Sequence, residues 1–211
     1  MLTPEQFLGF LTAAILITLS PGPDNMMVLG VGIAKGRARG IAFGLGCALG
    51  CLNHTLLAVI GVSALIAASP TAFTALKIAG GLYLIWMGIG ALRSRGGAQV
   101  AGAPGEMRPD EPARLLFLKG LLANAINPKV VLFFLSFLPQ FVVASRGDAN
   151  WQIAWLGLTF TAQAAVLFGL LGYFSGAIGQ WLNRTPRAGM WLDRVAGVIF
   201  VGLGLRLIVA R

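Results

Sequence analysis

Charged side chains are scarce in this sequence. Asp, Glu, Lys and Arg make up only 11% of its 211 residues, whereas about a quarter of the residues of a typical soluble domain are charged. Hydrophobic residues account for 57%, and the mean hydropathy is +0.81. Each bilayer-spanning helix needs roughly 20 predominantly apolar residues, so this composition supplies several such helices and leaves no room for a sizeable soluble domain. We therefore predict an all-α, polytopic membrane protein.

Groups that carry out covalent chemistry are equally sparse. There is one histidine, and the seven acidic residues lie mostly between apolar segments. The sequence has no glycine-rich nucleotide-binding loop, no nucleophile beside a general base and no cofactor fingerprint, so we expect no enzyme, no ATP-driven pump and no cofactor. The net charge of +9 does not indicate nucleic-acid binding, because the basic residues lie mostly between apolar segments, where they orient membrane helices.

The apolar residues fall into six segments. The longest connection, residues 94–114, is rich in Gly, Pro, Ala and charge, and it divides a single transporter domain of residues 1–211 into halves of about 1–93 and 115–211. We predict one transmembrane helix for each segment. The segments run over residues 5–33, 38–68, 72–92, 115–145, 151–182 and 190–209.

Lys and Arg residues are distributed unequally between the two ends of these segments. Eleven of the sixteen lie in or beside the first, third and fifth connections, four lie on the opposite side, and Lys129 lies inside the fourth segment. Because positively charged connections stay in the cytoplasm, both termini are expected outside the cytoplasmic (inner) membrane. No Lys or Arg precedes Lys35, so the first segment lacks the basic start of a cleavable signal peptide and we interpret it as the first transmembrane helix.

The first segment is interrupted by Ser20-Pro21-Gly22-Pro23-Asp24-Asn25. Proline removes a backbone donor and clashes with the preceding turn, so the helix is expected to break here. Irregular backbone at membrane depth is tolerated mainly where it is buried in protein or lines a cavity, and an ionisable residue at that depth is a candidate functional residue. We predict that Pro21, Gly22, Pro23, Asp24 and Asn25 hold a substrate or an ion.

The fourth segment carries a matching interruption, Asn127-Pro128-Lys129. Three segments per half is an odd number, so the second half must enter the membrane in the opposite direction. Inverted repeats with interrupted helices at corresponding positions indicate a transporter site near the midplane. We therefore predict two inverted three-helix repeats with broken first and fourth helices, and we place Asn124, Asn127, Pro128 and Lys129 on the other side of the site.

Two roles are open for each of the buried charges. Asp24 either caps the second half-helix through its free amides, or faces a cavity and binds a substrate ammonium or a coupling proton. Lys129 either supplies, with Asp24, the two poles that hold a zwitterion, or forms a structural ion pair or extends to the interface. Asn124 and Asn127 either bond the backbone groups that Pro128 frees or contact the substrate.

The second segment carries three potential metal ligands. Cys47, Cys51 and His54 lie on one face of the expected helix, and thiolates with an imidazole suit soft or borderline metals. Core packing is the alternative interpretation. Thr161 and Gln163, in the fifth segment, are weaker candidates for substrate contact, because a lone amide there typically joins helices.

Residues 18–50 read TLSPGPDNMMVLGVGIAKGRARGIAFGLGCALG, which is a Pro-Gly-Pro break followed by a glycine-flanked basic turn and a glycine-rich helix. This pattern resembles the LysE/RhtB family of bacterial amino-acid exporters. Residues 77–93 (KIAGGLYLIWMGIGALR) and 117–128 (FLKGLLANAINP) look like that family's third-helix and fourth-helix blocks. The resemblance covers nearly the whole chain, with residues 94–113 as the expected variable loop.

The resemblance implies six helices in the cytoplasmic membrane and export of amino acids or related metabolites, coupled to protons. It carries over Pro21, Gly22, Pro23, Asn127 and Pro128. At the position of Asp24 the family commonly has Asn, Asp or a small residue, which favours binding or local structure over an obligatory proton-carrier role.

We predict a secondary exporter that moves amino acids or close derivatives outward by alternating access, with proton antiport as the coupling. A divalent-metal exporter that uses Asp24, Cys47, Cys51 and His54 is the first alternative, and a membrane conduit for electrons through the two thiols is the second. The expected partners are an amino-acid substrate, a coupling proton and the lipid bilayer, and the sequence leaves open whether the chain forms a homo-oligomer.

Overall fold

A computed structural model of the chain describes residues 3–62, 69–94, 111–185 and 187–209. Every regular element among these residues is helical. The first half contains α1 (Pro4–Leu19), α2 (Pro23–Lys35), α3 (Arg37–Leu57) with the π-helical turn η1 (Ala58–Val62), and α5 (Pro70–Arg93). The second half contains α6 (Ala113–Ala125), α7 (Pro128–Leu132), the π-helical η2 (Phe133–Phe137), the 3₁₀ turns η3 (Leu138–Phe141) and η4 (Ala144–Arg146), α8 (Ala149–Arg184) and α9 (Ala188–Val209).

Each predicted segment corresponds to one of these elements or to a bent pair. Three helical stretches, Arg37–Gly61, Thr71–Leu92 and Ala149–Arg184, are long and apolar enough to cross a membrane, and there are five spans if each bent pair is counted as one. The sixth predicted segment corresponds to α9, which falls outside those five. Residues 63–68 of the second predicted segment and residues 95–110 of the predicted loop lie outside the described residues.

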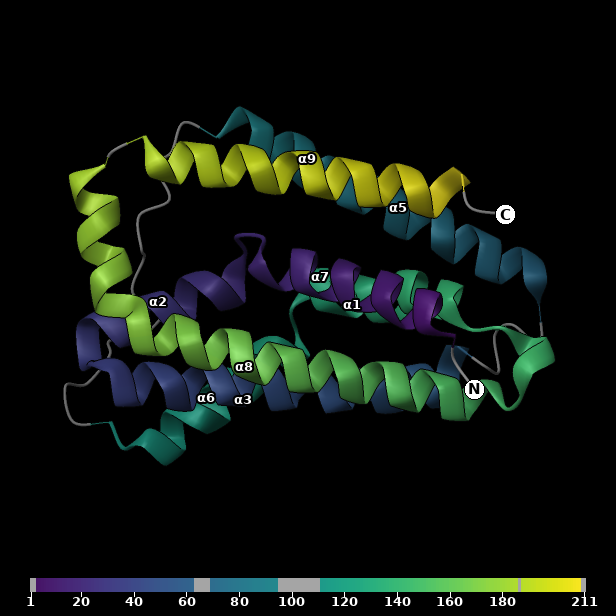
Figure 1. The fold of residues 1–211 in the computed structure, drawn as a ribbon, viewed down its shortest axis with the longest axis horizontal. Helices are drawn as coiled ribbons and strands as arrows, with labels where there is room; N and C mark the ends of the chain where they lie inside the picture. The colour runs from purple at the N-terminus through teal and green to yellow at the C-terminus, as the bar shows by residue number, and fades with distance from the viewer. Residues whose placement is uncertain (1–2, 63–68, 95–110, 186, 210–211) are drawn as a thin grey trace.

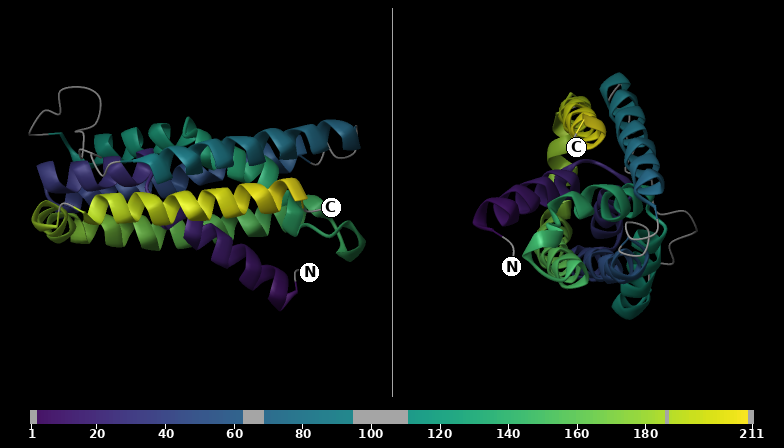
Figure 2. Two further views of the ribbon diagram at one scale, coloured as in Figure 1. Left: turned by 90° about the horizontal axis from the view of Figure 1, so that it is seen from above. Right: turned by 90° about the vertical axis from the view of Figure 1, so that its right-hand side faces the viewer.

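The helices form an elongated bundle (Figure 1). α5 and α9 run side by side along one edge, α3, α6 and α8 pack along the other, and α1 and α7 lie between these two groups. The two termini lie at one end of the bundle, and the turn between α2 and α3 lies at the opposite end, where α8 bends to reach α9. Figure 2 shows α1 inclined away from the bundle. Because α1 and α7 both lie between the two groups of helices, the two interrupted helices meet in the middle of the molecule.

Glycines allow α5 and α9 to approach closely. Gly81 lies against the carbonyl oxygen of Gly204, and Gly88 lies against that of Gly197. A Cβ added at any of these four glycines would lie 2.6–2.9 Å from the opposite carbonyl oxygen. In contrast, Gly36 forms the turn between α2 and α3 with φ +88°, a left-handed conformation that favours glycine.

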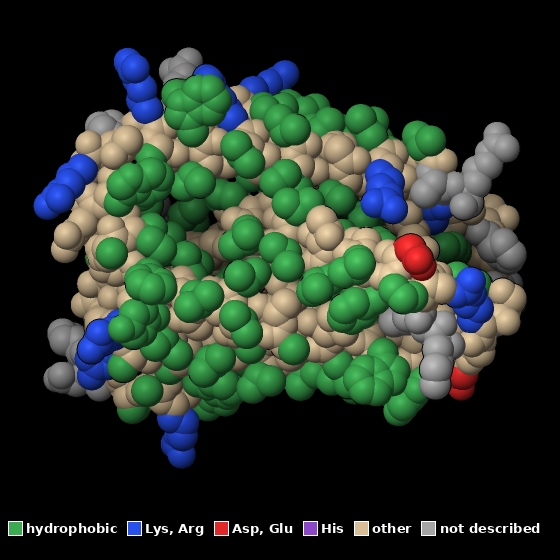
Figure 3. Space-filling view, in the orientation of Figure 1, with side chains coloured by type: hydrophobic (Ala, Val, Ile, Leu, Met, Phe, Trp, Pro, Cys, Tyr) green, Lys and Arg blue, Asp and Glu red, His purple; other side chains and the backbone are tan. Residues whose placement is uncertain are grey.

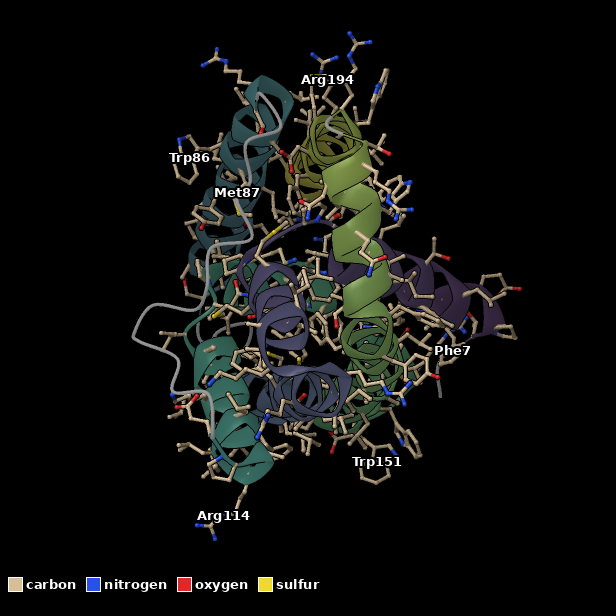
Figure 4. All side chains as sticks on the ribbon, turned by 90° about the vertical axis from the view of Figure 1, so that its left-hand side faces the viewer. Phe7, Trp86, Met87, Arg114, Trp151 and Arg194 are labelled. Carbon is tan, nitrogen blue, oxygen red and sulfur yellow. The ribbon has the colours of Figure 1, made fainter. Side chains whose placement is uncertain are left out.

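Large apolar side chains cover the outside of the bundle (Figure 3). Trp86 is 68% exposed and Trp151 is 66% exposed, and Figure 4 shows them, with Phe7, pointing outward on different sides. Such an apolar surface exceeds what soluble monomers expose and fits contact with lipid. Figure 4, viewed from the end opposite the termini, shows Arg194 projecting at the top of the bundle and Arg114 at the bottom.

Glu111, which precedes α6, joins three helices at that basic end. Its Oε2 accepts a hydrogen bond from Lys35 Nζ at 2.6 Å, and its Oε1 accepts one from Lys119. Its backbone carbonyl accepts a hydrogen bond from Arg39 Nε at 3.0 Å. The hydrogen bonds from Lys119 and Lys35 hold the pKa of the Glu111 carboxyl below its usual range. These contacts tie the ends of α2 and α3 to α6, and therefore one half of the chain to the other.

Candidate functional site

The first break separates α1 from α2 by a bend of 54°. In a continuous helix the carbonyl of Ile17 would bond the N–H of residue 21, and the carbonyl of Leu19 that of residue 23. Both positions are proline and have no N–H. The carbonyl of Thr18 accepts a hydrogen bond from Asn25 Nδ2 at 2.8 Å. The last turn of α1 therefore presents backbone oxygens to the interior of the protein.

The second break separates α6 from α7 by a bend of 50°. Asn127 caps α7, because its Oδ1 accepts a hydrogen bond from the backbone N–H of Lys129 at 3.1 Å. Asn127 therefore bonds a backbone N–H at the break, whereas its contact with a substrate stays a prediction. Its Nδ2 is buried without a hydrogen-bond partner among the described residues.

Asp24 does not cap α2. The cap position is Gly22, which makes no side-chain capping bond, so the capping interpretation of Asp24 is wrong. The Asp24 side chain is instead buried, and its Oδ2 accepts a hydrogen bond from Asn124 Nδ2 at 2.7 Å. Its Oδ1 has no partner within the described part of the chain. Asp24 thus carries an unused acceptor toward the centre of the bundle.

Asn124 connects Asp24 to α3. Its Oδ1 lies 3.6 Å from Cys51 Sγ, and its backbone carbonyl lies 3.0 Å from His54 Nε2. Because a carbonyl only accepts, the hydrogen of His54 must be on Nε2. Among the described residues no three His, Cys, Asp or Glu side chains are arranged to hold a metal ion, and the buried Cys47, like Cys51, is on α3. Of the side chains that prompted the metal and thiol alternatives, Asp24, Cys51 and His54 contact Asn124. Cys47 is buried one turn before Cys51.

Lys129 is buried, with 3% of its surface exposed. Its Nζ donates to the carbonyl oxygens of Ile17, at 3.1 Å, and Ser20, at 3.0 Å, and lies 3.5 Å from Asn25 Oδ1. No carboxylate of a described residue makes an ion pair with this ammonium. Lys129 therefore neither pairs directly with Asp24 nor extends to the interface, and it joins the second break to the first.

A small cavity lies between the breaks. It has room for about one water molecule. Gln163 Nε2 donates to the hydroxyl of Thr18, one of the lining residues, at 2.9 Å, while Gln163 Oε1 is buried without a partner in the described chain. The lining residues are Ile17, Thr18, Asp24, Cys51, Asn124, Lys129, Val130, Phe133, Phe160 and Phe168. Because the cavity is smaller than any amino acid, the helices must separate before such a substrate can enter.

Aromatic rings close the side of the cavity that faces the termini. Phe133 and Phe137 stack with centroids 5.1 Å apart, and Phe134 meets Phe160 edge-on at 5.0 Å. The cluster continues through Phe10 and Phe141. On the other side, an apolar cleft reaches Thr18, Asn25 and Phe168 from between the first break and α8. Figure 3 shows a hollow in this face of the molecule where α8 bends toward α9.

The structure brings the predicted site residues together from the two breaks. Asp24, Asn25, Asn124, Asn127 and Lys129 are buried there. The prolines shape the backbone and Gly22 leaves space for Lys129. Sequence reasoning missed the carbonyl oxygens of Ile17 and Ser20. The spacing of four residues from Ile17 to Pro21 is the signal that could have revealed the first of them.

The family LysE type translocator matches residues 15–211. The chain belongs to this family. The LysE-type chain is 32% identical to the threonine efflux protein of Escherichia coli K12 over 96% of this chain and 98% of that protein. It is 30% identical to the leucine efflux protein of Enterobacter sp. 638 over 96% of this chain and 94% of that protein. It is also 30% identical to an uncharacterized membrane protein of Vibrio cholerae, covering 97% of each chain.

No solved structure matches this LysE-type chain. The family match nevertheless confirms the resemblance inferred from the Pro-Gly-Pro break and the glycine-rich helix after it. The predicted class, a multi-pass membrane transporter, is likewise confirmed by the family and by the apolar helices.

Proposed function

We propose that this chain exports a neutral α-amino acid and holds it between the two breaks. Three buried polar atoms without partners among the described residues carry the proposal: Asp24 Oδ1, Asn127 Nδ2 and Gln163 Oε1. Buried polar groups normally have hydrogen-bond partners, and in our proposal the bound substrate supplies them. Two acceptors and one donor suit a zwitterion, whose ammonium donates to Asp24 and Gln163 and whose carboxylate accepts from Asn127.

The cavity walls favour an uncharged substrate side chain. Val130, Phe133, Phe160 and Phe168 line the cavity, and such apolar walls do not compensate a second charge. The names of two relatives, a threonine efflux protein and a leucine efflux protein, agree with a neutral amino acid. We therefore propose neutral amino acids or close derivatives as the substrates.

Two inverted halves provide a route for alternating access. In our proposal the six spans are α1 with α2, α3 with η1, α5, α6 through η3, α8 and α9, in one domain of the cytoplasmic membrane with both termini outside. The similar bends of 54° and 50° support the repeat, as does the proline that begins the second half-helix in each case. The aromatic cluster then closes the outer side, and the contacts of Glu111 close the cytoplasmic side. Proton antiport supplies the driving force.

The decisive experiment is efflux from cells loaded with a panel of labelled amino acids, with and without a proton gradient. We expect export of at least one neutral amino acid, and a gradient dependence of its rate. Asp24→Asn removes the charge that pairs with the substrate ammonium and is expected to raise the KM about 10- to 100-fold. Asn183→Ala, an exposed change at the end of α8, is the matched control.

Each variant is compared at equal abundance in the membrane. Efflux no faster than from cells without the protein, for every neutral amino acid in the panel, contradicts the proposal. A reporter fused to either terminus and found in the cytoplasm contradicts the proposed orientation.

A further inference from the structure

The first break assembles three oxygen atoms around one point. The carbonyl of Ile17 is free because Pro21 has no N–H, and Ser20 lies between the two helices, so its carbonyl has no helical partner either. The side chain of Asn25 adds an amide oxygen from the first turn of α2, because its Nδ2 is already bonded to Thr18. Two backbone carbonyls and one amide oxygen, all uncharged, therefore converge.

The ammonium of Lys129 occupies this point. It lies 3.1 Å and 3.0 Å from the two carbonyl oxygens and 3.5 Å from Asn25 Oδ1. A Cβ added to Gly22 would lie 2.9 Å from Nζ. The backbone of Gly22 is extended, with φ −171°, so the conformation does not demand glycine here, but a larger side chain would meet the ammonium. The ring of Phe200 lies on another side, 6.0 Å from Nζ.

Such a set of oxygens has the chemistry of a monovalent-cation site. Carbonyl and amide oxygens are the ligands that hard cations take, and the unwound backbone of interrupted helices coordinates Na⁺ in other transporters. We propose that the Lys129 ammonium is a tethered substitute for a bound alkali cation, and that protonation of this amine takes the place of Na⁺ binding in the coupled step. The second part rests on the proton antiport proposed above.

The contact between the Lys129 ammonium and the three oxygens bridges the two halves of the chain, which is where a coupling contact must lie. Lys129 is in the first turn of α7, whereas all three oxygens belong to the first break, so the ammonium ties the two halves together. When the ammonium gives one proton to water on the cytoplasmic side, the amine loses its charge and one donor, and the halves are released. A proton taken up from the outer side restores the tie. Two titratable groups, Asp24 on α2 and Cys51 on α3, line the same cavity as Lys129. The end of α1 faces the ammonium with backbone carbonyls, and α9 faces it with the ring of Phe200.

Alkali-cation binding to purified protein tests the site directly. Lys129→Ala opens the space, and Lys129→Met fills it with an uncharged chain of similar length. With ionic strength held constant by choline chloride, Na⁺, Li⁺ or K⁺ at ten times its dissociation constant is expected to raise the melting midpoint of Lys129→Ala by about 3–6 °C. The wild type and Lys129→Met are expected not to shift. Absence of a shift in Lys129→Ala with all three cations overturns the cation site.

Flux in proteoliposomes tests the coupling. Wild-type flux of a transported amino acid is expected to follow a pH gradient equally in Na⁺ and in choline. Lys129→Met is expected to retain exchange of labelled for unlabelled substrate, whereas its gradient-driven net flux is expected to fall by about tenfold or more. A wild-type requirement for Na⁺, or undiminished gradient-driven flux in Lys129→Met, overturns the coupling role.

Two further results keep the outcomes separable. Gly22→Ala retains Lys129 but moves its ammonium away from the three oxygens, so this variant is expected to reproduce the loss of gradient-driven flux. If the lysine variants do not fold, Gly22→Ala tests the coupling role in their place. If the wild type transports no amino acid at all, the proposed function fails, whereas the melting shift of Lys129→Ala still tests the cation site.

Discussion

Replacing Asn124 by alanine is expected to lower the free energy of unfolding by about 1.5–3 kcal/mol. The Asn124 Nδ2 donates to Asp24 Oδ2 at 2.7 Å, and both side chains are almost completely buried. The other oxygen of Asp24 already lacks a partner among the described residues. Truncation of Asn124 therefore leaves a buried carboxyl with no hydrogen bond at all. A hydrogen bond to a charged acceptor is worth about 1.5–3 kcal/mol.

A double-mutant cycle separates this bond from the other effects of the truncation. In an Asp24→Asn background the same truncation breaks a bond between two neutral amides, which is worth about 0.5–1.5 kcal/mol. The difference, a coupling energy of about 1 kcal/mol, belongs to the charge on Asp24. The backbone contact of Asn124 with His54 Nε2 does not depend on the side chain, so it is present in all four proteins.

Equilibrium unfolding of the purified variants in mixed detergent micelles measures the four free energies. Asn183→Ala, which changes an exposed side chain, is expected to alter the stability by no more than about 0.5 kcal/mol. If Asn124→Ala is as stable as Asn183→Ala, or if the cycle gives no coupling, Asp24 does not depend on Asn124 and the account of this pair is wrong.

Two other regions give measurable expectations. Gly46→Ala puts a Cβ against the carbonyl oxygen of Phe117, whereas a Cβ at Gly169 meets no atom within 4 Å. In the same unfolding assay, Gly46→Ala is expected to destabilise the protein by about 1–3 kcal/mol, and Gly169→Ala to be neutral or stabilising by up to about 1 kcal/mol. Equal effects of the two substitutions would contradict the close approach of α3 to α6. The pKa of the Glu111 carboxyl is lowered by Lys119 and Lys35, so its contacts are expected to persist as pH falls below the usual carboxyl value of about 4.3 and to be lost only as pH falls through the lowered value. Hydrogen exchange in the turn between α2 and α3, corrected for intrinsic rates, should be constant from neutral pH to that range and faster in Glu111→Gln, and unchanged exchange in Glu111→Gln would contradict this.

Local chemistry accounts for what could be predicted from the sequence. Pro21, Pro23 and Pro128 remove backbone donors wherever the rest of the chain lies, so both breaks were predictable from their positions alone. The helix boundaries also follow from local composition, and α5 at Pro70–Arg93 lies within two residues of the predicted 72–92 at each end. Of the two roles left open for Asp24, capping is wrong, since α2 begins with Gly22 as its cap.

Partner choice within the site was not predictable in this way. Pro21 dictates that the carbonyl of Ile17 is free, but Lys129, more than a hundred positions away in the chain, supplies its hydrogen bond. Asn124 likewise bonds Asp24 across the bundle. The sequence identifies the groups that lack a local partner, because backbone geometry is set by neighbours along the chain. Which distant side chain fills each vacancy, and which atoms are left for a substrate, depends on how the helices pack, and only the tertiary structure settles that.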